Sequence, residues 1–447
     1  MNTRTLDMTR GNPTRLLLSF SVPMLIGNLF QQLYNLCDSV LVGKLVSADA
    51  LAAVGATGSV TFLFFALCNG ISSGGGILTS QAYGRRSDGD IRKSIINTAY
   101  VMLILPTLVG LTAFLLAPAL LTLLSTPENI FDDALIYTRT MCVGIVFVSV
   151  YNFASSMLRA LGDSRTPLYF LIFSCFLNVV LDLVFILSFH LGVFGAAIAT
   201  IISQFSSAVI CLIYAVKKNP YFRISREERH PDLTCIKRIL RLGIPLSLQF
   251  SLIAISCMAM QRTVNSFGAT AIAAFTATSR IEQMLHLPYQ TLSSALSTYS
   301  GQNWGAAQTG RVKEGYHKSL IMMALFTLVM VPVIQLFGTS LISLFVKAEE
   351  SDVILMGGQA LRITSLFYIF LGVIYVIRGV LNGLGDASFA LLNGIVEVLG
   401  RFIVPILLCS ISSIGVWGIW WSVGVVWFFS GFSAWLRCRS YRKKLGI

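Results

Sequence analysis

The chain has 447 residues, of which 55% are hydrophobic and 12% are charged, and its mean hydropathy is +0.76. Soluble domains carry about 25% charged residues, so this composition excludes a soluble enzyme or binding module and predicts a polytopic membrane protein. The net charge of +13 would suit nucleic acid, but its placement along the chain, described below, argues against a nucleic-acid partner.

Twelve apolar stretches are long enough to cross a bilayer as helices, which satisfy their own backbone hydrogen bonds in lipid. The predicted spans are 16–43, 52–80, 93–117, 134–158, 167–189, 193–216, 239–266, 270–299, 316–345, 355–381, 387–410 and 414–436. The longest polar segment separates spans six and seven. We therefore expect an all-α fold. Its expected parts are an N-terminal six-helix lobe (1–216), a cytoplasmic linker (217–238), a C-terminal six-helix lobe (239–436) and a basic cytoplasmic tail (437–447).

Basic residues gather on one side of this topology. They occupy the N-terminus, the loops after spans two, four and eight, the central linker and the C-terminus, whereas the other side carries acidic residues such as Glu128, Glu349 and Asp352. Because positively charged loops stay inside, both termini are predicted to be cytoplasmic. The charge is thus a topology signal of a protein in the cell membrane, and contact with anionic lipid follows from it.

An internal repeat relates the two halves. Pro23, Gln81-Ala-Tyr-Gly84 and Leu161-Gly-Asp163 recur as Pro245, Gln302-Asn-Trp-Gly305 and Leu384-Gly-Asp386, at offsets of 221 to 223 residues. Each repeat contains an even number of spans, so both halves cross the membrane in the same direction. The predicted relation is a parallel repeat with its axis along the membrane normal, as in one class of secondary transporters.

Several small residues and prolines have structural interpretations. Pro23 and Pro245 each remove a backbone donor from the first span of a repeat and should kink it. Both are hinge candidates, although a static bend explains them equally well. The run Ser72-Ser-Gly-Gly-Gly76 lacks the Lys-Ser/Thr of a phosphate loop, and close helix packing is its expected role.

Span five carries Asn178 and Asp182, whose spacing of four places both on one helix face. A carboxylate in a bilayer costs ~2.5–3.5 kcal/mol, so it indicates a functional group with a partner. Counted from the outer span ends at ~1.5 Å per residue, Asp38, Asp182 and Thr200 lie at one depth, ~8–10 Å inside, with Asn178 one turn deeper.

These four residues, Asp38, Asn178, Asp182 and Thr200, form the predicted cation-binding set. The alternative is a set of structural hydrogen bonds between helices. The second repeat has no such cluster, because its corresponding positions are close to Met260, Arg401, Pro405 and Val423. A purely structural role would not require this asymmetry between the repeats.

The second half has its own intramembrane charges. Glu397 and Arg401 lie four residues apart and are expected to form a buried ion pair, with a substrate contact as the alternative. Arg280 and Glu282 in span eight are further candidates for charges that face a substrate cleft.

The chain resembles the multidrug and toxic compound extrusion (MATE) family of the multidrug/oligosaccharidyl-lipid/polysaccharide flippase superfamily. The residues that carry the resemblance are Pro23, Pro245, Arg159-Ala-Leu-Gly-Asp163, Gly195-Ala-Ala-Ile-Ala-Thr200 and Gln302-Asn-Trp-Gly-Ala306. The resemblance implies two six-helix lobes and export of amphipathic, often cationic compounds by Na⁺ or H⁺ antiport. In family members with an N-lobe cation site, residues matching Asp38, Asn178, Asp182 and Thr200 take part. Other members use acidic residues on span seven, where this sequence has Gln249, Gln261 and Arg262 but no carboxylate.

The expected mechanism is alternating access driven by a coupling ion. Two carboxylates that lie close together in a low dielectric do not both ionise cheaply, and a proton or Na⁺ relieves their repulsion. We expect a functional monomer in the bilayer that takes small amphipathic molecules and has no resident cofactor or metal and no catalytic activity. Two alternatives stay open: a flippase for a lipid-linked oligosaccharide or other lipid-like substrate, and a membrane-embedded transferase.

Overall fold

The computed structural model describes residues 5–347 and 349–445, and all regular secondary structure within these ranges is helical. Ten helices of the described chain are long and apolar enough to cross a membrane. They are α1 (Pro13–Leu45), α3 (Gly58–Gly84), α4 (Asp88–Leu123), α5 (Glu128–Ala160), α6 (Arg165–Leu183) with its extension η1 (Val184–Ser188), α7 (Gly192–Lys218), α8 (Leu233–Asn265), α10 (Thr309–Ile342), α13 (Ala387–Cys409) and α14 (Gly418–Leu445), the last preceded by η4 (Gly415–Trp417). The predicted all-α, multi-pass architecture is confirmed.

The other three predicted spans differ from a single, strongly apolar helix. Span two is interrupted at Thr57, which separates α2 (Ala48–Ala56) from α3, and the Thr57 hydroxyl donates to the Val54 carbonyl at 2.7 Å. Span ten consists of α11 (Ser351–Ser365) and α12 (Tyr368–Gly383), which meet at an angle of 53°. Span eight is the single helix α9 (Ala269–Gly305), whose many Ser, Thr and Gln residues make it less apolar than the other spans. All twelve predicted stretches are therefore helical.

The described chain divides into two compact units. Unit 1 contains residues 5–7 and 22–248, and unit 2 contains residues 8–21 and 249–445. Both boundaries inside the helical region fall within helices rather than loops, one beside Pro23 in α1 and one three residues after Pro245 in α8. Residues 1–4 of the expected N-terminal lobe and 446–447 of the expected tail lie outside the described residues.

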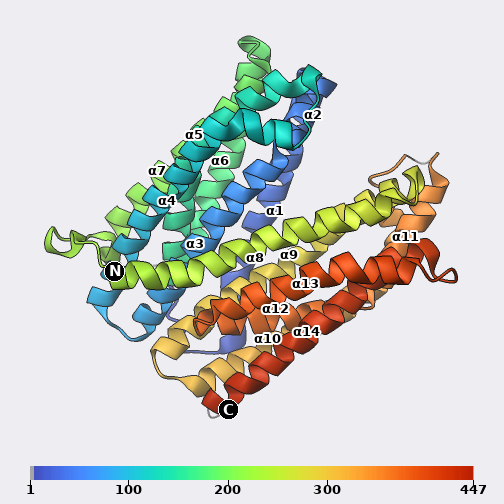
Figure 1. The fold of residues 1–447 in the computed structure, drawn as a ribbon. Coiled ribbons are helices and arrows are strands. Elements are labelled where there is room, and N and C mark those ends of the chain that lie inside the picture. Colours follow the sequence, from blue (N-terminus) through green and yellow to red (C-terminus); the bar gives the residue numbers. More distant parts are fainter. Residues whose placement is uncertain (1–4, 348, 446–447) are drawn as a thin grey trace. The chain divides into compact units, whose positions relative to one another are not determined.

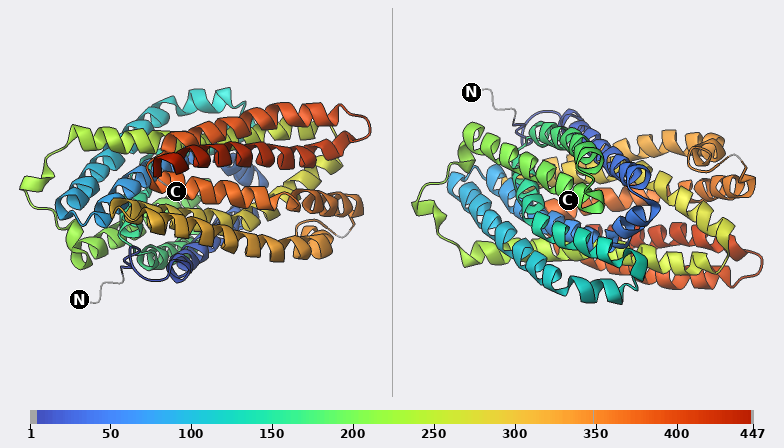
Figure 2. Two further views of the ribbon diagram at one scale, coloured as in Figure 1. Left: turned by 90° about the horizontal axis from the view of Figure 1, so that it is seen from below. Right: turned by 90° about the horizontal axis from the view of Figure 1, so that it is seen from above.

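In unit 1, α3, α4, α5 and α7 lie side by side (Figures 1 and 2). The expected close packing of the glycine run is confirmed. A Cβ on Gly74 would lie 2.6 Å from the backbone nitrogen of Gly243, and one on Gly76 would lie 2.7 Å from the Ser156 hydroxyl. The same Ser156 hydroxyl donates to the Ser72 carbonyl at 2.7 Å. Small side chains thus let α3 approach α5 and the first turns of α8 closely.

In unit 2, α9 packs on α10, α11 and α12, and α14 packs on α12 and α13 (Figure 2). The motif at the end of α9 binds the segment before α1. Gln302 accepts from the Met8 backbone N–H at 3.0 Å, and Asn303 donates to the Met8 carbonyl at 3.1 Å. Arg311 contacts the same carbonyl at 3.2 Å and donates to Asn303 at 3.0 Å. Met8 is completely buried, so these residues fix the segment that leads into α1 within unit 2.

The linker between α7 and α8 contains two short 3₁₀ turns, η2 (Pro220–Phe222) and η3 (Glu227–Arg229), and is attached to α4 by charge. Arg92 pairs with Glu228 at 3.0 Å, and Lys93 pairs with Asp232. The hydrogen bond from Lys93 and the backbone N–H of Cys235 lower the pKa of Asp232. The backbone N–H of Ser225 and the Arg92 guanidinium lower the pKa of Glu228.

Candidate cation site

The position of the polar face of α6 depends on how that helix begins. Gly162 adopts a φ of +92°, which ends the preceding helix. Asp163 then accepts hydrogen bonds from the backbone N–H groups of Arg165 and Thr166 at 3.1 and 3.0 Å, as a residue that caps a helix start does. From this start, the helix carries Asn178 and Asp182 to fully buried positions.

A wider helical turn follows Asp182. Residues Val184–Ser188 form a π-helical segment, in which the hydrogen bonds skip one more residue than in an α-helix. Such segments are rare in proteins as a whole. Those that occur lie frequently at functional sites, because they redirect the side chains of one turn. Nothing in the local sequence predicted this segment.

Thr200 of α7 links the helices of the candidate site. Its hydroxyl lies 3.4 Å from the hydroxyl of Tyr34 on α1. Asn178 on α6 also contacts Thr200. In the amide orientation that gives both the oxygen and the nitrogen a partner, the oxygen accepts from the Thr200 backbone N–H at 3.2 Å and the nitrogen donates to Asp182 Oδ2 at 2.9 Å. Helices α1, α6 and α7 therefore meet at this point.

Asp38 and Asp182 complete the set. Their carboxyl groups are within hydrogen-bonding reach of one another. One oxygen of each, Oδ1 in both cases, is buried and has no hydrogen-bond partner among the described residues. Two acceptor-only groups in contact need a proton or a cation between them. The structure thus brings together the three residues that helix rise had placed at one level, Asp38, Asp182 and Thr200, and Asn178 one turn deeper.

Two tyrosines near the site were not predicted. Tyr34 lies one turn before Asp38 on α1, and Tyr137 comes from α5; both interact electrostatically with Asp38 and Asp182. The i, i+4 spacing could have identified Tyr34, whereas only tertiary packing brings Tyr137 here. Tyr137 also belongs to a buried apolar cluster with Val42 and Ile186, which limits access of water to the carboxylates.

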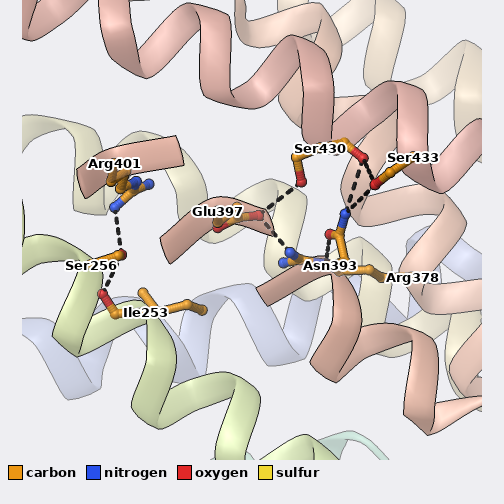
Figure 3. Close-up of polar contacts among 8 residues, drawn as sticks. All are labelled: Ile253, Ser256, Arg378, Asn393, Glu397, Arg401, Ser430 and Ser433. Carbon is orange, nitrogen blue, oxygen red and sulfur yellow. Dashed lines mark hydrogen bonds and ion pairs between the residues drawn. The ribbon is translucent and has the colours of Figure 1, made fainter. Parts of the chain in front are cut away.

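The charges of the second half are arranged differently from the sequence-based expectation (Figure 3). Glu397 is paired with Arg378 of α12 at 2.5 Å, not with Arg401, and it also accepts from the Ser430 hydroxyl at 3.2 Å. The Arg378 guanidinium donates to Asn393 at 2.8 Å as well. The predicted partner of Glu397 is therefore wrong. Glu397 pairs with Arg378 on a different helix and not with Arg401, its neighbour one turn along α13.

Arg401 instead points toward α8. Its guanidinium donates to the Ser256 hydroxyl at 3.2 Å and contacts the Cys257 thiol at 3.6 Å (Figure 3). Glu282 on α9 is half-buried, whereas Arg280 is exposed, so these two neighbours do not share an environment.

The MatE family profile matches residues 23–184 and 245–407, once in each half. The probable multidrug resistance protein YpnP of Bacillus subtilis is 34% identical over 446 residues, covering 98% of this chain and 97% of the relative. The multidrug export protein MepA of Staphylococcus aureus is 22% identical over 407 residues, covering 91% of this chain and 89% of the relative.

Solved structures share the fold. A MATE crystal structure in complex with MaL6 superposes with a TM-score of 0.92 at 23% identity over 100% of both chains. The outward-facing conformation of a multidrug resistance MATE family transporter also gives 0.92 at 23% identity, covering 100% of this chain and 99% of the other.

Proposed function

The chain belongs to the MatE family, and we propose that it is a multidrug exporter driven by the inward flow of a cation. The observation that carries the proposal is the contact of Asp38 with Asp182 beside Asn178 and Thr200 in unit 1. Membership of a transporter family of multi-pass membrane proteins accounts for the twelve helical stretches. The substrates are small amphipathic compounds, as the names of the multidrug relatives suggest.

Coupling follows from the chemistry of the site. A proton shared by the two carboxyl groups, or a Na⁺ ion held by carboxylate, amide and hydroxyl oxygens, removes their repulsion. An empty site favours a different arrangement of the helices from an occupied site, so the ion shifts the equilibrium between two states. One charge moving through ~100 mV supplies ~2.3 kcal/mol, enough for a substrate ratio of several tens.

The two helix prolines are the proposed hinges of this change. Pro23 and Pro245 lie close to the points where the chain passes from one unit to the other. A proline inside a helix removes one backbone hydrogen bond and makes that turn easier to bend. We place the protein in the cell membrane with both termini in the cytoplasm and propose no catalytic activity for it. We propose that it acts as a monomer, because each chain carries both repeats.

The flippase alternative would require basic side chains that are free to bind a lipid-linked anionic group. Two of the intramembrane arginines are already engaged within unit 2. Arg378 is paired with Glu397 at 2.5 Å, and Arg362 donates to the Gln335 carbonyl at 3.0 Å. The names of the multidrug relatives also favour the exporter.

The test is export by carboxylate variants. Cells that express Asp38→Asn or Asp182→Asn should lose ion-driven export of a fluorescent cationic dye, while the amount of protein in the membrane stays at the wild-type level. Asp133→Asn, which changes the same chemical group at an exposed position, is the matched control. Wild-type export by either site variant would refute the proposed site. Varying Na⁺ and pH separately in membrane vesicles identifies the ion, and export that ignores both gradients would refute antiport.

A further inference from the structure

Arg139 lies in the membrane-spanning helix α5 of unit 1, and its side chain is half-buried. Its guanidinium lies over the ring of Phe114 on α4, with 5.3 Å between the guanidinium carbon and the ring centre. Its Nε is buried without a hydrogen-bond partner, and no carboxylate of the described residues lies within ion-pair distance of it. An ionised group in a membrane span is expensive, so it indicates a function with a partner to be identified.

The second repeat has an arginine at the corresponding position. Arg362 follows Arg139 by 223 residues, the offset that also separates the two Leu-Gly-Asp motifs. Arg362 Nε donates to the Gln335 carbonyl on α10 at 3.0 Å, and the Gln335 amide donates to the Arg362 carbonyl at 2.9 Å. The neighbouring helix thus satisfies Nε in unit 2, whereas Nε of Arg139 in unit 1 has no such partner among the described residues. Helix packing alone therefore does not account for Arg139.

The surface around Arg139 is apolar. Ile136 and Val143 lie one turn before and one turn after it on α5, and Leu111 and Leu115 lie on the adjacent α4. All four side chains are between 44% and 67% exposed. Exposed apolar side chains on membrane-spanning helices form a surface for lipid acyl chains. The partner that Arg139 lacks within the chain is therefore expected from the bilayer.

The depth of Arg139 suits a lipid headgroup. Arg139 is five residues from residue 134, where the fourth span is predicted to begin, which corresponds to ~8 Å at ~1.5 Å per residue. A long arginine side chain keeps its stem in apolar surroundings and extends its guanidinium toward the headgroup level. This end of the span is predicted to lie opposite the basic cytoplasmic loops, so the charge of Arg139 is separate from the charge that sets the topology.

We propose that Arg139 binds the phosphate of an anionic phospholipid of the outer leaflet, whose acyl chains lie along the exposed apolar residues of α4 and α5. The guanidinium suits a phosphate because its planar fork forms two parallel, charge-assisted hydrogen bonds. One arginine balances the single negative charge of phosphatidylglycerol, whereas the choline group of phosphatidylcholine already balances its own phosphate. The site therefore prefers phosphatidylglycerol. This lipid site goes beyond the proposed export function and does not depend on the coupling ion.

The experiment measures lipid contact at the site itself. The full-length protein is placed in lipid nanodiscs that contain a trace of phosphatidylglycerol or phosphatidylcholine with a photoactivatable diazirine near the glycerol end of one acyl chain. After irradiation, mass spectrometry quantifies the labelling of residues 108–118 and 134–146. Phosphatidylglycerol should label the wild-type protein about tenfold more than phosphatidylcholine, as expected for a hydrogen bond to a charged group.

Three variants test the role of the guanidinium. In Arg139→Gln the ratio of the two labelling yields should fall to about twofold or less, because the charge is lost. Arg139→Lys keeps the charge and loses the fork, so its ratio should lie between those of Arg139→Gln and the wild type. Arg262→Gln removes an exposed arginine near the end of α8 and is the matched control, which should be labelled like the wild type.

Two results would overturn the inference directly. Equal labelling of the wild-type protein by the two lipids would do so, whether or not Arg139→Gln folds, and so would a wild-type ratio in Arg139→Gln. Inorganic phosphate in excess, with chloride at the same ionic strength as the reference, tests for a free anion. Labelling by phosphatidylglycerol should persist in both salts. Its loss in phosphate alone would show that the site takes free phosphate and would refute the lipid assignment.

Discussion

Arg378 and Glu397 form an ion pair of 2.5 Å between α12 and α13, and both side chains are more than nine-tenths buried. Asn393 and Ser430 supply further hydrogen bonds to the pair. Removing one member of a buried pair leaves an uncompensated charge, which costs about 3–5 kcal/mol. Arg378→Ala and Glu397→Ala should therefore each lower the melting temperature of the purified protein clearly. Replacing both by Met should cost much less than the two single changes combined, and additive losses would contradict the pairing.

The Thr200 hydroxyl should matter for the coupling ion more than for stability. Thr200→Val keeps the shape of the side chain and removes the oxygen that lies 3.4 Å from the Tyr34 hydroxyl. We expect the ion concentration for half-maximal export to rise about tenfold, as for the loss of one hydrogen bond to a charged group, with an unchanged melting temperature. Tyr34→Phe, which leaves the Thr200 hydroxyl in place, should have a smaller effect. An unchanged ion dependence of Thr200→Val would remove Thr200 from the site.

The bonds to Met8 predict what the Gln302–Gly305 motif does. Asn303→Ala removes one bond to the Met8 carbonyl and the acceptor for Arg311, so the segment before α1 should open more often. Trypsin should then cleave after the exposed Arg10 faster than in the wild-type protein, as followed by mass spectrometry. Gln308→Ala, at the exposed start of α10, is the control and should be cleaved at the wild-type rate.

The linker attachment should depend on pH. The pKa of Asp232 and that of Glu228 are lowered in the folded protein, so each carboxylate stabilises the attachment fully above its unfolded pKa. That contribution is lost as the pH falls through the lowered pKa values of the folded protein. Hydrogen exchange of residues 223–232 should therefore be faster at pH 3 than at pH 6 after correction for the intrinsic rate, and Asp232→Asn should show the faster exchange already at pH 6.

The hinge proposal predicts a change in turnover without a change in stability. Pro245→Ala restores a backbone donor inside α8 and should stiffen the turn beside the unit boundary. The maximal export rate should fall several-fold, while the substrate concentration for half-maximal export and the melting temperature stay near the wild-type values. Pro332→Ala, inside α10 and away from both boundaries, is the control. Equal effects of the two substitutions would argue for a static bend.

Local rules predicted much of the candidate site. Asn178 and Asp182 are recognisable because a polar pair four residues apart is costly in an apolar span, and helix rise alone places Asp38 and Thr200 at the level of Asp182. Depth along a helix is a property of one segment, so the sequence determines it. Tyr137 and the π-helical turn after Asp182 could not be predicted, because neither follows from the pattern of its own segment.

The apolar length of the segments determined that this is a multi-pass helical protein, since lipid offers the backbone no other partners. The offsets between repeated motifs likewise determined its two-fold organisation. Tertiary structure alone decided the partners of the charges. Glu397 pairs with Arg378 on another helix, and no carboxylate of the described residues lies within ion-pair distance of Arg401, one turn away. Ion pairs form between side chains that packing brings together, and the rotation of one helix against the next is set by contacts far apart in the sequence.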